Sequence, residues 1–276
     1  MKRAQFPLCA LLAASCGLVA SCGPDSAQSA AGQKEAAEAA LQSACTSDEF
    51  ERVPLTHCVA DPARHAISVV LGPKSGAPYR SLERLANAHS NDAANIAFAT
   101  NAGMFDEAGK PIGYTVEQGK RLHTLNRADG PGNFHLQPNG VFFGSDGVWK
   151  VLTSEAFANT VKVRPRFATQ SGPMLVIAGK LHPEIAEDGE SRYIRNGVGV
   201  DAQGRAHFVI SDAPLSFGKL ARYFRDALKV ENALYLDGNV SALWDPVMGR
   251  IDVSPPLGPL IVVEKRAMAS AESERP

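Results

Sequence analysis

The sequence has no excess of charge of either sign. Its 276 residues include 28 Lys and Arg against 29 Asp and Glu, which gives a formal net charge of −1. A protein that binds nucleic acid through the phosphates needs a basic excess to neutralise them. The charge balance therefore excludes an electrostatic nucleic-acid binder of the usual kind.

Several familiar catalytic signatures are also missing. There is no Gly-x-Ser-x-Gly elbow, so an α/β-hydrolase is unsupported, and there is no Walker A run or dinucleotide fingerprint. The seven histidines are scattered without His-Glu-x-x-His spacing, so a zinc enzyme lacks its ligands. We expect no cofactor and no metal site, although the sequence leaves a bound divalent cation open.

Long hydrophobic runs are scarce, and the one at the N-terminus has the form of a targeting signal. Residues 1–22 begin with Lys2 and Arg3, continue with an apolar stretch too short and too interrupted to span a bilayer, and end in small residues before Cys22. The segment 19–22 resembles a bacterial lipobox, in which Cys22 is lipidated. The alternative is a plain secretory signal with Cys22 incidental. Either form predicts an exported protein of the periplasm or cell envelope, and a lipid would be its only membrane attachment.

Cysteine is scarce as well. Two of the five cysteines lie in the targeting segment and one is Cys22, which leaves Cys45 and Cys58. In an oxidising compartment we expect these two to form a disulfide, because no second Cys/His pair has a metal-ligand spacing. Residues 23–45 have little to bury and predict a tether, and 267–276 predict a disordered tail. One domain remains, over residues 46–266.

The 24 glycines and 18 prolines favour many turns and short strands within this domain. Three hairpins are predicted, over 140–153 with Asp146-Gly147 at the turn, over 173–181, and over 197–211. Short helices are predicted near 82–89 and, as an amphipathic segment, over 217–228. The fold class expected is α+β: a single domain with a mixed, mostly antiparallel sheet and a few packed helices.

Polar residues cluster where several apolar strands end. Six segments show this pattern: "TNAGMF", "GNFHLQPNGVF", "ATQSGPML", "RYIRNGVGV", "VISDAPLSFG" and "YLDGNVSALW". Each could be a turn, since Asn, Asp, Ser and Gly are turn formers. Together they indicate a site displayed at the ends of strands, with glycines that let a ligand approach the backbone.

Five of these motifs, in order, resemble the phosphodiester glycosidase family: "NAGMF", "PNGVFF", "ATQSGPML", "RNGVGVDAQGRAHFVIS" and "NALYLDGNVSALW". The resemblance spans about 66–263 and is closest to the exported bacterial branch. Better-studied members tend to carry Asp-Gly-Gly-x-Ser, whereas this chain has Asn239 at the third position. The resemblance implies cleavage of a sugar-1-phosphodiester, for example of GlcNAc, at the anomeric carbon.

That chemistry assigns roles to two residues. An oxocarbenium-like transition state needs a carboxylate near the anomeric carbon, and Asp237 is the candidate. The expelled phosphate is matched by the fork of donors of a guanidinium, and Arg195 is the candidate. The alternatives are a turn-capping aspartate and a surface arginine.

The remaining candidates support these two. Glu117 is the candidate for a second catalytic carboxylate, with Asp212 as its competitor and a solvated charge as the alternative for each. Ser241 is expected to position Asp237. The residues predicted to contact the sugar or phosphate are Asn101, Asn139, Gln170, Ser171, Gly172, Gly238, Asn239 and Ser241.

Three functions stay open at this point. The first is an exported hydrolase of the glycosidic C–O bond in an envelope or extracellular glycoconjugate. The second is a non-catalytic saccharide-binding or envelope-assembly lipoprotein, and the third is a phosphodiesterase that cleaves P–O. The expected partner is a saccharide-phosphate substrate, not a nucleic acid, and the expected state is a monomer.

Overall fold

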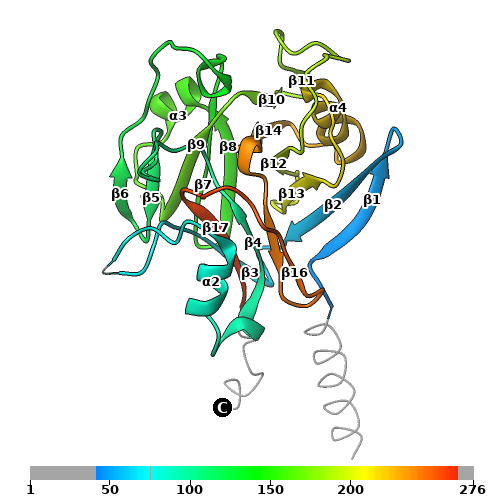
Figure 1. The fold of residues 1–276 in the computed structure, drawn as a ribbon. Helices are drawn as coiled ribbons and strands as arrows, with labels where there is room; N and C mark the ends of the chain where they lie inside the picture. The colour runs from blue at the N-terminus through cyan, green and yellow to red at the C-terminus, as the bar shows by residue number, and fades with distance from the viewer. Residues whose placement is uncertain (1–41, 75, 267–276) are drawn as a thin grey trace, which may run out of the picture. The chain divides into compact units, whose positions relative to one another are not determined.

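The computed structural model describes residues 42–74 and 76–266 (Figure 1). The predicted signal peptide 1–22 with Cys22, all but the end of the tether 23–45, and the tail 267–276 lie outside these residues. Within them, no helix has both the length and the apolar character needed to cross a membrane. From Ser43 onward the described chain forms one compact unit.

Three antiparallel sheets build this unit. The seven-stranded sheet has the order β1 (Cys45–Phe50), β2 (Val53–Ala60), β13 (Ala206–Ser211), β12 (Asn196–Val200), β14 (Asn232–Tyr235), β10 (Met174–Ile177) and β11 (Lys180–Leu181). One five-stranded sheet has the order β16 (Arg250–Ile251), β15 (Leu243–Asp245), β4 (Ile96–Asn101), β17 (Leu260–Lys265) and β3 (His65–Val70). The other has the order β6 (Lys120–His123), β5 (Thr115–Glu117), β9 (Phe167–Ser171), β7 (Gly140–Ser145) and β8 (Val148–Thr153).

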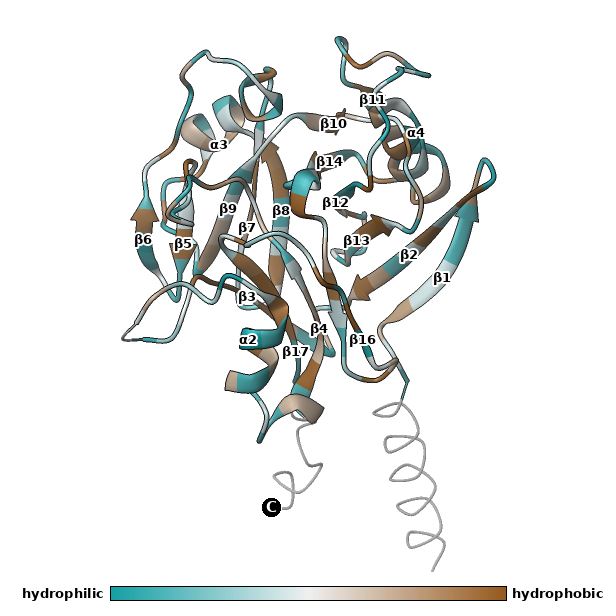
Figure 2. Ribbon diagram, in the orientation of Figure 1, coloured by the Kyte–Doolittle hydropathy of each residue, from teal (hydrophilic) through white to brown (hydrophobic). Residues whose placement is uncertain are grey.

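The α+β prediction is confirmed, with the strands divided among three sheets. The main core lies where the inner faces of these sheets meet. Phe208 of β13 packs edge-on against Phe98 of β4 and Phe142 of β7, with ring centroids 5.3 and 5.7 Å apart. Figure 2 shows β17 as a hydrophobic strand, whereas the edge strand β1 is largely hydrophilic. Side chains of one strand alternate between faces, so each sheet can bury one set and solvate the other.

Local turn chemistry explains the predicted hairpins. Asp146 and Gly147 have φ of 47° and 84°, and Ala178 and Gly179 have φ of 48° and 75°. Two consecutive left-handed residues make the tight turn whose twist matches antiparallel strands. The hairpins β7–β8, β10–β11 and β12–β13 all form as predicted.

The helices are short. Helix α2 (Leu82–Ala88) begins at Ser81, whose side chain accepts the Arg84 N–H, and α3 (Ser154–Thr160) begins at Thr153 in the same way. Helix α4 (Phe217–Arg222) continues into a π-helical segment, η3 (Tyr223–Ala227). The predicted amphipathic helix is therefore two segments, and Leu220 and Phe224 bury its apolar face against the seven-stranded sheet.

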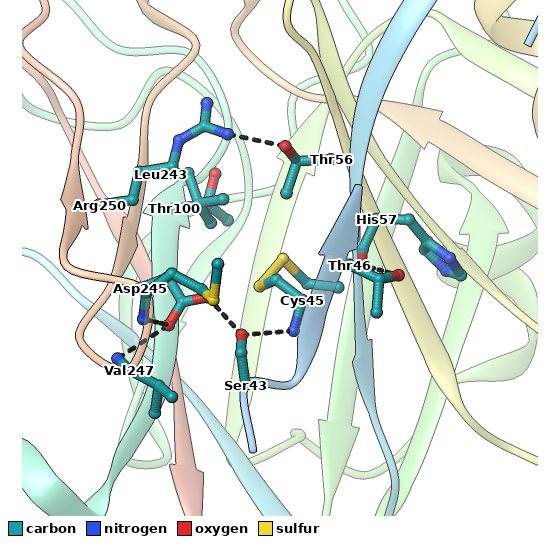
Figure 3. Close-up of a disulfide and its surroundings, with 12 residues drawn as sticks. Ser43, Cys45, Thr46, Thr56, His57, Thr100, Leu243, Asp245, Val247 and Arg250 are labelled. Atoms are coloured by element: carbon teal, nitrogen blue, oxygen red, sulfur yellow. Dashed lines mark hydrogen bonds between the residues drawn. A yellow bond between two sulfur atoms is a disulfide. The ribbon is translucent and has the colours of Figure 1, made fainter. Parts of the chain in front are cut away.

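A disulfide joins Cys45 and Cys58, the pair that the sequence singles out. They lie directly opposite each other in the β1–β2 ladder. Figure 3 shows how the start of β1 is held: the Ser43 hydroxyl accepts the Cys45 N–H at 2.8 Å and donates to the Asp245 carboxylate. The disulfide and this hydrogen-bond pair fasten β1 to β2 and to β15.

The seven-stranded sheet carries a row of titratable side chains on β2 and β13. His57 Nε2 lies 2.9 Å from His207 Nδ1, and His207 Nε2 lies 3.0 Å from an Asp201 oxygen. Burial lowers the pKa of His57 to about 4, and repulsion from His207 adds to this effect against the opposing field of Asp48. The folded protein therefore holds His57 neutral where an unfolded chain would protonate it.

This difference predicts an acid sensitivity. Between about pH 6.5 and pH 4 the unfolded chain binds a proton at His57 that the folded chain does not, so stability is lost as the pH falls through this window. We expect His57→Gln to reduce the pH 7-to-4 loss in the free energy of unfolding by on the order of 2 kcal/mol. Urea unfolding of the wild type and of His57→Gln between pH 7 and pH 4 measures this difference. An identical dependence of the free energy of unfolding on pH in the two proteins would contradict the low pKa of His57.

Candidate active site

The loop that carries Asp237 connects two sheets. Strand β14 belongs to the seven-stranded sheet and β15 to a five-stranded one, so the chain crosses between them at 237–242. Asp237 ends the buried run from β14, and its side chain accepts the Asn239 N–H at 3.3 Å to begin the short helix η4 (Gly238–Val240). The aspartate thus caps a turn, as the alternative interpretation proposed, and it also stands at a junction of sheets.

Asn101 holds both ends of this loop. Its Nδ2 donates to the Asp237 carbonyl at 2.9 Å, and its Oδ1 accepts the Ala242 N–H at 3.0 Å. Asn196, at the start of β12, donates to the same Oδ1 at 2.8 Å. The Ser241 hydroxyl lies 3.3 Å from Asn196 Oδ1 and 3.3 Å from the Gly238 carbonyl. Strands from different sheets therefore meet at one buried amide.

Asp237 is a buried carboxylate without a cationic partner. It is 9% exposed, and within residues 42–74 and 76–266 no Lys, Arg or His forms an ion pair with it. Burial raises its pKa, and the Asn239 N–H only partly opposes this. A poorly solvated carboxylate gains more than a solvated one from positive charge that develops beside it.

Arg195 is buried as well. It is 1% exposed; Nε donates to the Leu215 carbonyl at 3.0 Å, and Nη2 donates to the carbonyl and hydroxyl of Ser191. Its guanidinium carbon lies 3.6 Å from the centre of the Phe217 ring. No carboxylate in the described chain pairs with it, so its positive charge remains uncompensated next to the Asp237 loop.

Tyr235 connects Arg195 to Asp237. Arg195 Nη1 donates to its phenolic oxygen at 3.2 Å. Burial raises the pKa of Tyr235; Arg195 opposes this and the nearby Asp237 charge reinforces it. Because its oxygen accepts the Arg195 hydrogen bond, the phenol keeps its own proton to donate. Tyr235 and Asp237 are two residues apart in an extended segment, so they lie on one face.

Glycine is required at position 238 by this contact. A Cβ there would lie 1.7 Å from the Tyr235 hydroxyl, far inside any allowed distance. Gly238 is thus explained by a close approach between the loop and Tyr235, which the sequence interpretation had assigned to a ligand.

Comparison with known proteins bears directly on this site. The model of the phosphodiester glycosidase family matches residues 94–251, more than half of the chain, including Asn101, Arg195, Tyr235 and Asp237. The chain belongs to the phosphodiester glycosidase family. It is 37% identical over 154 residues to uncharacterized protein YigE of Escherichia coli strain K12, a match that covers 56% of this chain and 60% of YigE.

Solved structures share the fold. The zebrafish N-acetylglucosamine-1-phosphodiester alpha-N-acetylglucosaminidase catalytic domain, auto-inhibited by its pro-peptide, superposes with a TM-score of 0.55 at 14% identity and covers 80% of this chain and 82% of its own. A hypothetical protein from Synechocystis gives 0.51 at 15% identity, with 80% and 61% covered. A putative exported protein from Burkholderia pseudomallei K96243 gives 0.51 at 12% identity, with 77% and 74% covered. At these identities the likeness shows the fold alone.

The donors of Arg195 do not fit the phosphate contact expected from the sequence. A guanidinium has five N–H donors, and four of them already serve the Leu215 carbonyl, the Tyr235 oxygen and the two Ser191 oxygens. Bidentate capture of a phosphate needs two free donors on one edge. In this member of the family, the contact of Arg195 with the residues around Asp237 is its hydrogen bond to Tyr235.

Three amides predicted to contact substrate are instead buried clamps. Asn101 holds the loop described above. Gln170 accepts the Tyr114 and Asn126 N–H groups at 2.8 and 3.0 Å, and Asn139 donates to the Phe134 carbonyl at 3.0 Å. Each of the three is at most 1% exposed. Because their polar atoms are spent on the protein itself, the expectation that Asn101, Asn139 and Gln170 bind the sugar or phosphate is replaced by a positioning role.

Ser171 and Gly172 are equally enclosed. Ser171 is fully buried, and its hydroxyl has no hydrogen-bond partner among the described residues. A Cβ on Gly172 would lie 2.7 Å from the Phe134 carbonyl, so this glycine allows a close approach by the protein backbone. Asn239, in contrast, is exposed beside Asp237 and stays a candidate for ligand contact.

Both candidates for a second carboxylate are held by partners other than Asp237. Glu117 ends β5 and accepts the Leu71 N–H at 3.3 Å, and burial raises its pKa. Thr115 of β5 pairs with Thr169, so Glu117 lies further toward the other end of the sheet from Ser171. Asp212 accepts the Thr56 hydroxyl and pairs with Arg250 at 3.0 Å. In the described chain, no three His, Cys, Asp or Glu residues are grouped to hold a metal ion.

The buried state of Asp237 predicts a gain in stability on its removal. The raised pKa means that the protonated form is favoured by folding, so this stabilisation is complete below the unfolded pKa and is lost as the pH rises through the folded pKa. We expect Asp237→Asn, which is neutral at every pH, to raise the free energy of unfolding at pH 7 and to leave it unchanged near pH 3. Urea unfolding at both values measures this; a less stable variant at pH 7 would contradict it.

Proposed function

We propose that this protein is an exported hydrolase that cleaves the glycosidic C–O bond of a sugar-1-phosphodiester in an envelope or extracellular glycoconjugate. Membership of the phosphodiester glycosidase family supports the reaction type. The observation that carries the proposal is the line of Arg195, Tyr235 and Asp237, a buried cation and a buried carboxylate on either side of one phenol. GlcNAc-1-phosphodiester is the first substrate class to test.

Asp237 is the catalytic carboxylate in this proposal. As the bond to the phosphate breaks, positive charge develops at the anomeric carbon, and the ionised aspartate stabilises it as nucleophile or as electrostatic partner. Because burial disfavours the ionised form of Asp237 before the reaction, the attraction that develops in the transition state is larger than it would be in water.

Tyr235 and Arg195 serve the leaving group. The expelled phosphate monoester carries negative charge, and the buried Tyr235 hydroxyl and Arg195 lie behind the Asp237 loop, where they favour an anion without touching it. Arg195 polarises that hydroxyl through the 3.2 Å contact from Nη1, and its charge favours an anion nearby. Arg195 and Tyr235 are positioning residues in this scheme, and Asp237 is the catalytic residue.

Export and anchoring belong to the same proposal. The signal-like segment 1–22 supports secretion, and the Cys45–Cys58 disulfide is suited to an oxidising compartment. Lipidation of Cys22 would tether the protein to the envelope, where phosphate-linked saccharides occur. We propose a monomer that needs no cofactor for this hydrolysis.

A second candidate function is a non-catalytic saccharide-binding or envelope-assembly lipoprotein. The engagement of Glu117 and Asp212 with partners other than Asp237 favours it, since most glycoside hydrolases place two carboxyl groups about the scissile bond. A phosphate leaving group, however, departs without a proton from a general acid. A measurement of substrate turnover distinguishes the hydrolase from the non-catalytic binding protein.

The decisive experiment is hydrolysis of UDP-GlcNAc and other GlcNAc-1-phosphodiesters by the full chain. We expect release of free sugar, a loss of at least about 10³-fold in kcat/KM for Asp237→Asn, and a loss of about 10²-fold for Tyr235→Phe. Glu117→Gln is the matched control and should retain wild-type activity. The acid limb of the wild-type pH profile should lie above the ordinary range of an aspartate. Folded wild type without turnover on any member of the class would favour the binding protein.

Labelled water identifies the bond that breaks. In H₂¹⁸O, cleavage of C–O places the label in the sugar, and cleavage of P–O places it in the phosphate. We expect the label in the sugar. A label in the phosphate would assign a phosphodiesterase and remove the role proposed for Asp237.

A further inference from the structure

A polar cavity lies away from Asp237. It has a volume of about 200 Å³, and its lining comes from β6, from α3 and from the segment that follows this helix. Its lining includes Arg121 of β6, Lys162 and Arg164 of that segment, and the rings of Tyr114 and Phe157. We call this the cationic pocket, because it has three basic side chains and no acidic residue in its lining.

The three cations of the cationic pocket are unpaired. Arg121, Lys162 and Arg164 are exposed, and none forms an ion pair with any described residue. Some other basic side chains are paired: Arg222 lies 2.7 Å from Glu51, and Arg250 lies 3.0 Å from Asp212. Three like charges around one cavity repel one another, and an anion between them would relieve this.

The floor of the cationic pocket is aromatic and firmly held. The Tyr114 and Phe157 rings lie 5.0 Å apart, and Phe157 packs on Phe143 at 4.9 Å. The Tyr114 N–H donates to Gln170 Oε1 at 2.8 Å, so the clamp that orders this part of the sheet also fixes the floor. Burial raises the pKa of the Tyr114 phenol, and the charges of Arg164 and Arg121, which line the same pocket, partly oppose this rise.

The cationic pocket is separate from the candidate active site. Tyr114 packs with Phe143 and Ala168 on the outer face of its sheet. Phe142 and Phe167 alternate with these residues and face the main core, and Thr169, whose hydroxyl accepts the Gly103 N–H, also points inward. A ligand in the cationic pocket therefore leaves the Asp237 loop free.

We propose that the cationic pocket binds a phosphate group carried by a saccharide. The two guanidinium groups and the ammonium group hold the phosphate oxygens, and the apolar face of the sugar ring rests on Tyr114. A volume of about 200 Å³ is below the roughly 300–1,000 Å³ of pockets for drug-sized ligands, which fits one phosphorylated sugar residue. This binding does not depend on the proposed hydrolysis, since a protein without turnover would retain it.

Calorimetric titration of the full chain with N-acetylglucosamine 6-phosphate tests the proposal. This probe has no phosphate at its anomeric carbon, so it is no substrate for the proposed reaction. We expect binding that weakens between 50 and 300 mM NaCl and a Kd raised at least about tenfold in Arg121→Gln/Arg164→Gln. Arg166→Gln, an exposed arginine outside the lining, is the matched control and should change the Kd less than about twofold. Asp237→Asn should bind like wild type.

Other results would overturn the proposal. These are no binding of the probe by folded wild type, an unchanged Kd in the double variant, or equal affinity for neutral N-acetylglucosamine. Inorganic phosphate that binds as tightly as the sugar phosphate would assign free phosphate as the ligand and remove the saccharide. Because Arg121 and Arg164 are exposed, the double variant is expected to keep the wild-type melting temperature, and thermal unfolding checks this.

Discussion

The side-chain amide of Asn101 is the contact on which the site depends. It donates to the carbonyl at one end of the 237–242 loop and accepts the N–H at the other, while Asn196 donates to it from a second sheet. A buried backbone group that lost its partner would cost about 1–3 kcal/mol, so a residue without an amide cannot replace Asn101 cheaply. The geometry of Asp237 is thus set by strands from two different sheets, and the loop needs no regular structure of its own beyond one short turn.

Arg195 illustrates the opposite arrangement, a charge whose compensation is incomplete. Carbonyls, hydroxyls and the Phe217 ring surround its guanidinium, but no carboxylate of residues 42–74 or 76–266 neutralises it. Removal of a charged group from water costs several kcal/mol unless the group is paired with an opposite charge. A buried cation without such a partner therefore favours the binding of an anion near it. The Tyr235 phenol lies between this cation and Asp237, so the preference is directed at the same loop.

The sequence predicts the parts of this fold that depend on local chemistry. Asp146-Gly147 determines a hairpin because both residues accept a left-handed backbone conformation. Ser81 begins α2 because its side chain accepts the N–H of Arg84, three residues along the chain. Asn139 and Gln170 mark the right region, but their role depends on Phe134, Tyr114 and Asn126, which only the tertiary structure brings near. A buried amide that clamps the backbone and one that binds a sugar have the same sequence pattern. The sequence does not single out Tyr235, because an aromatic residue in an apolar strand has the same pattern as a core residue. Its spacing of two residues from Asp237 is the feature that could have indicated a place in the site.

The triplet Asp237-Gly238-Asn239 shows how unequal three adjacent constraints can be. Gly238 is fixed by the Tyr235 hydroxyl, since any Cβ would overlap it. Asp237 is held by the hydrogen bond from Asn101 to its carbonyl and by its own position as the capping residue of η4. Asn239 contributes its N–H to the Asp237 carboxylate, and its side chain is exposed. The backbone group does not depend on the side chain, so a glycine or an asparagine can supply it equally. The departure from Asp-Gly-Gly therefore leaves the Asp237 carboxylate and its turn intact. Any effect of Asn239 on substrate specificity must come from a contact between its exposed side-chain amide and a ligand.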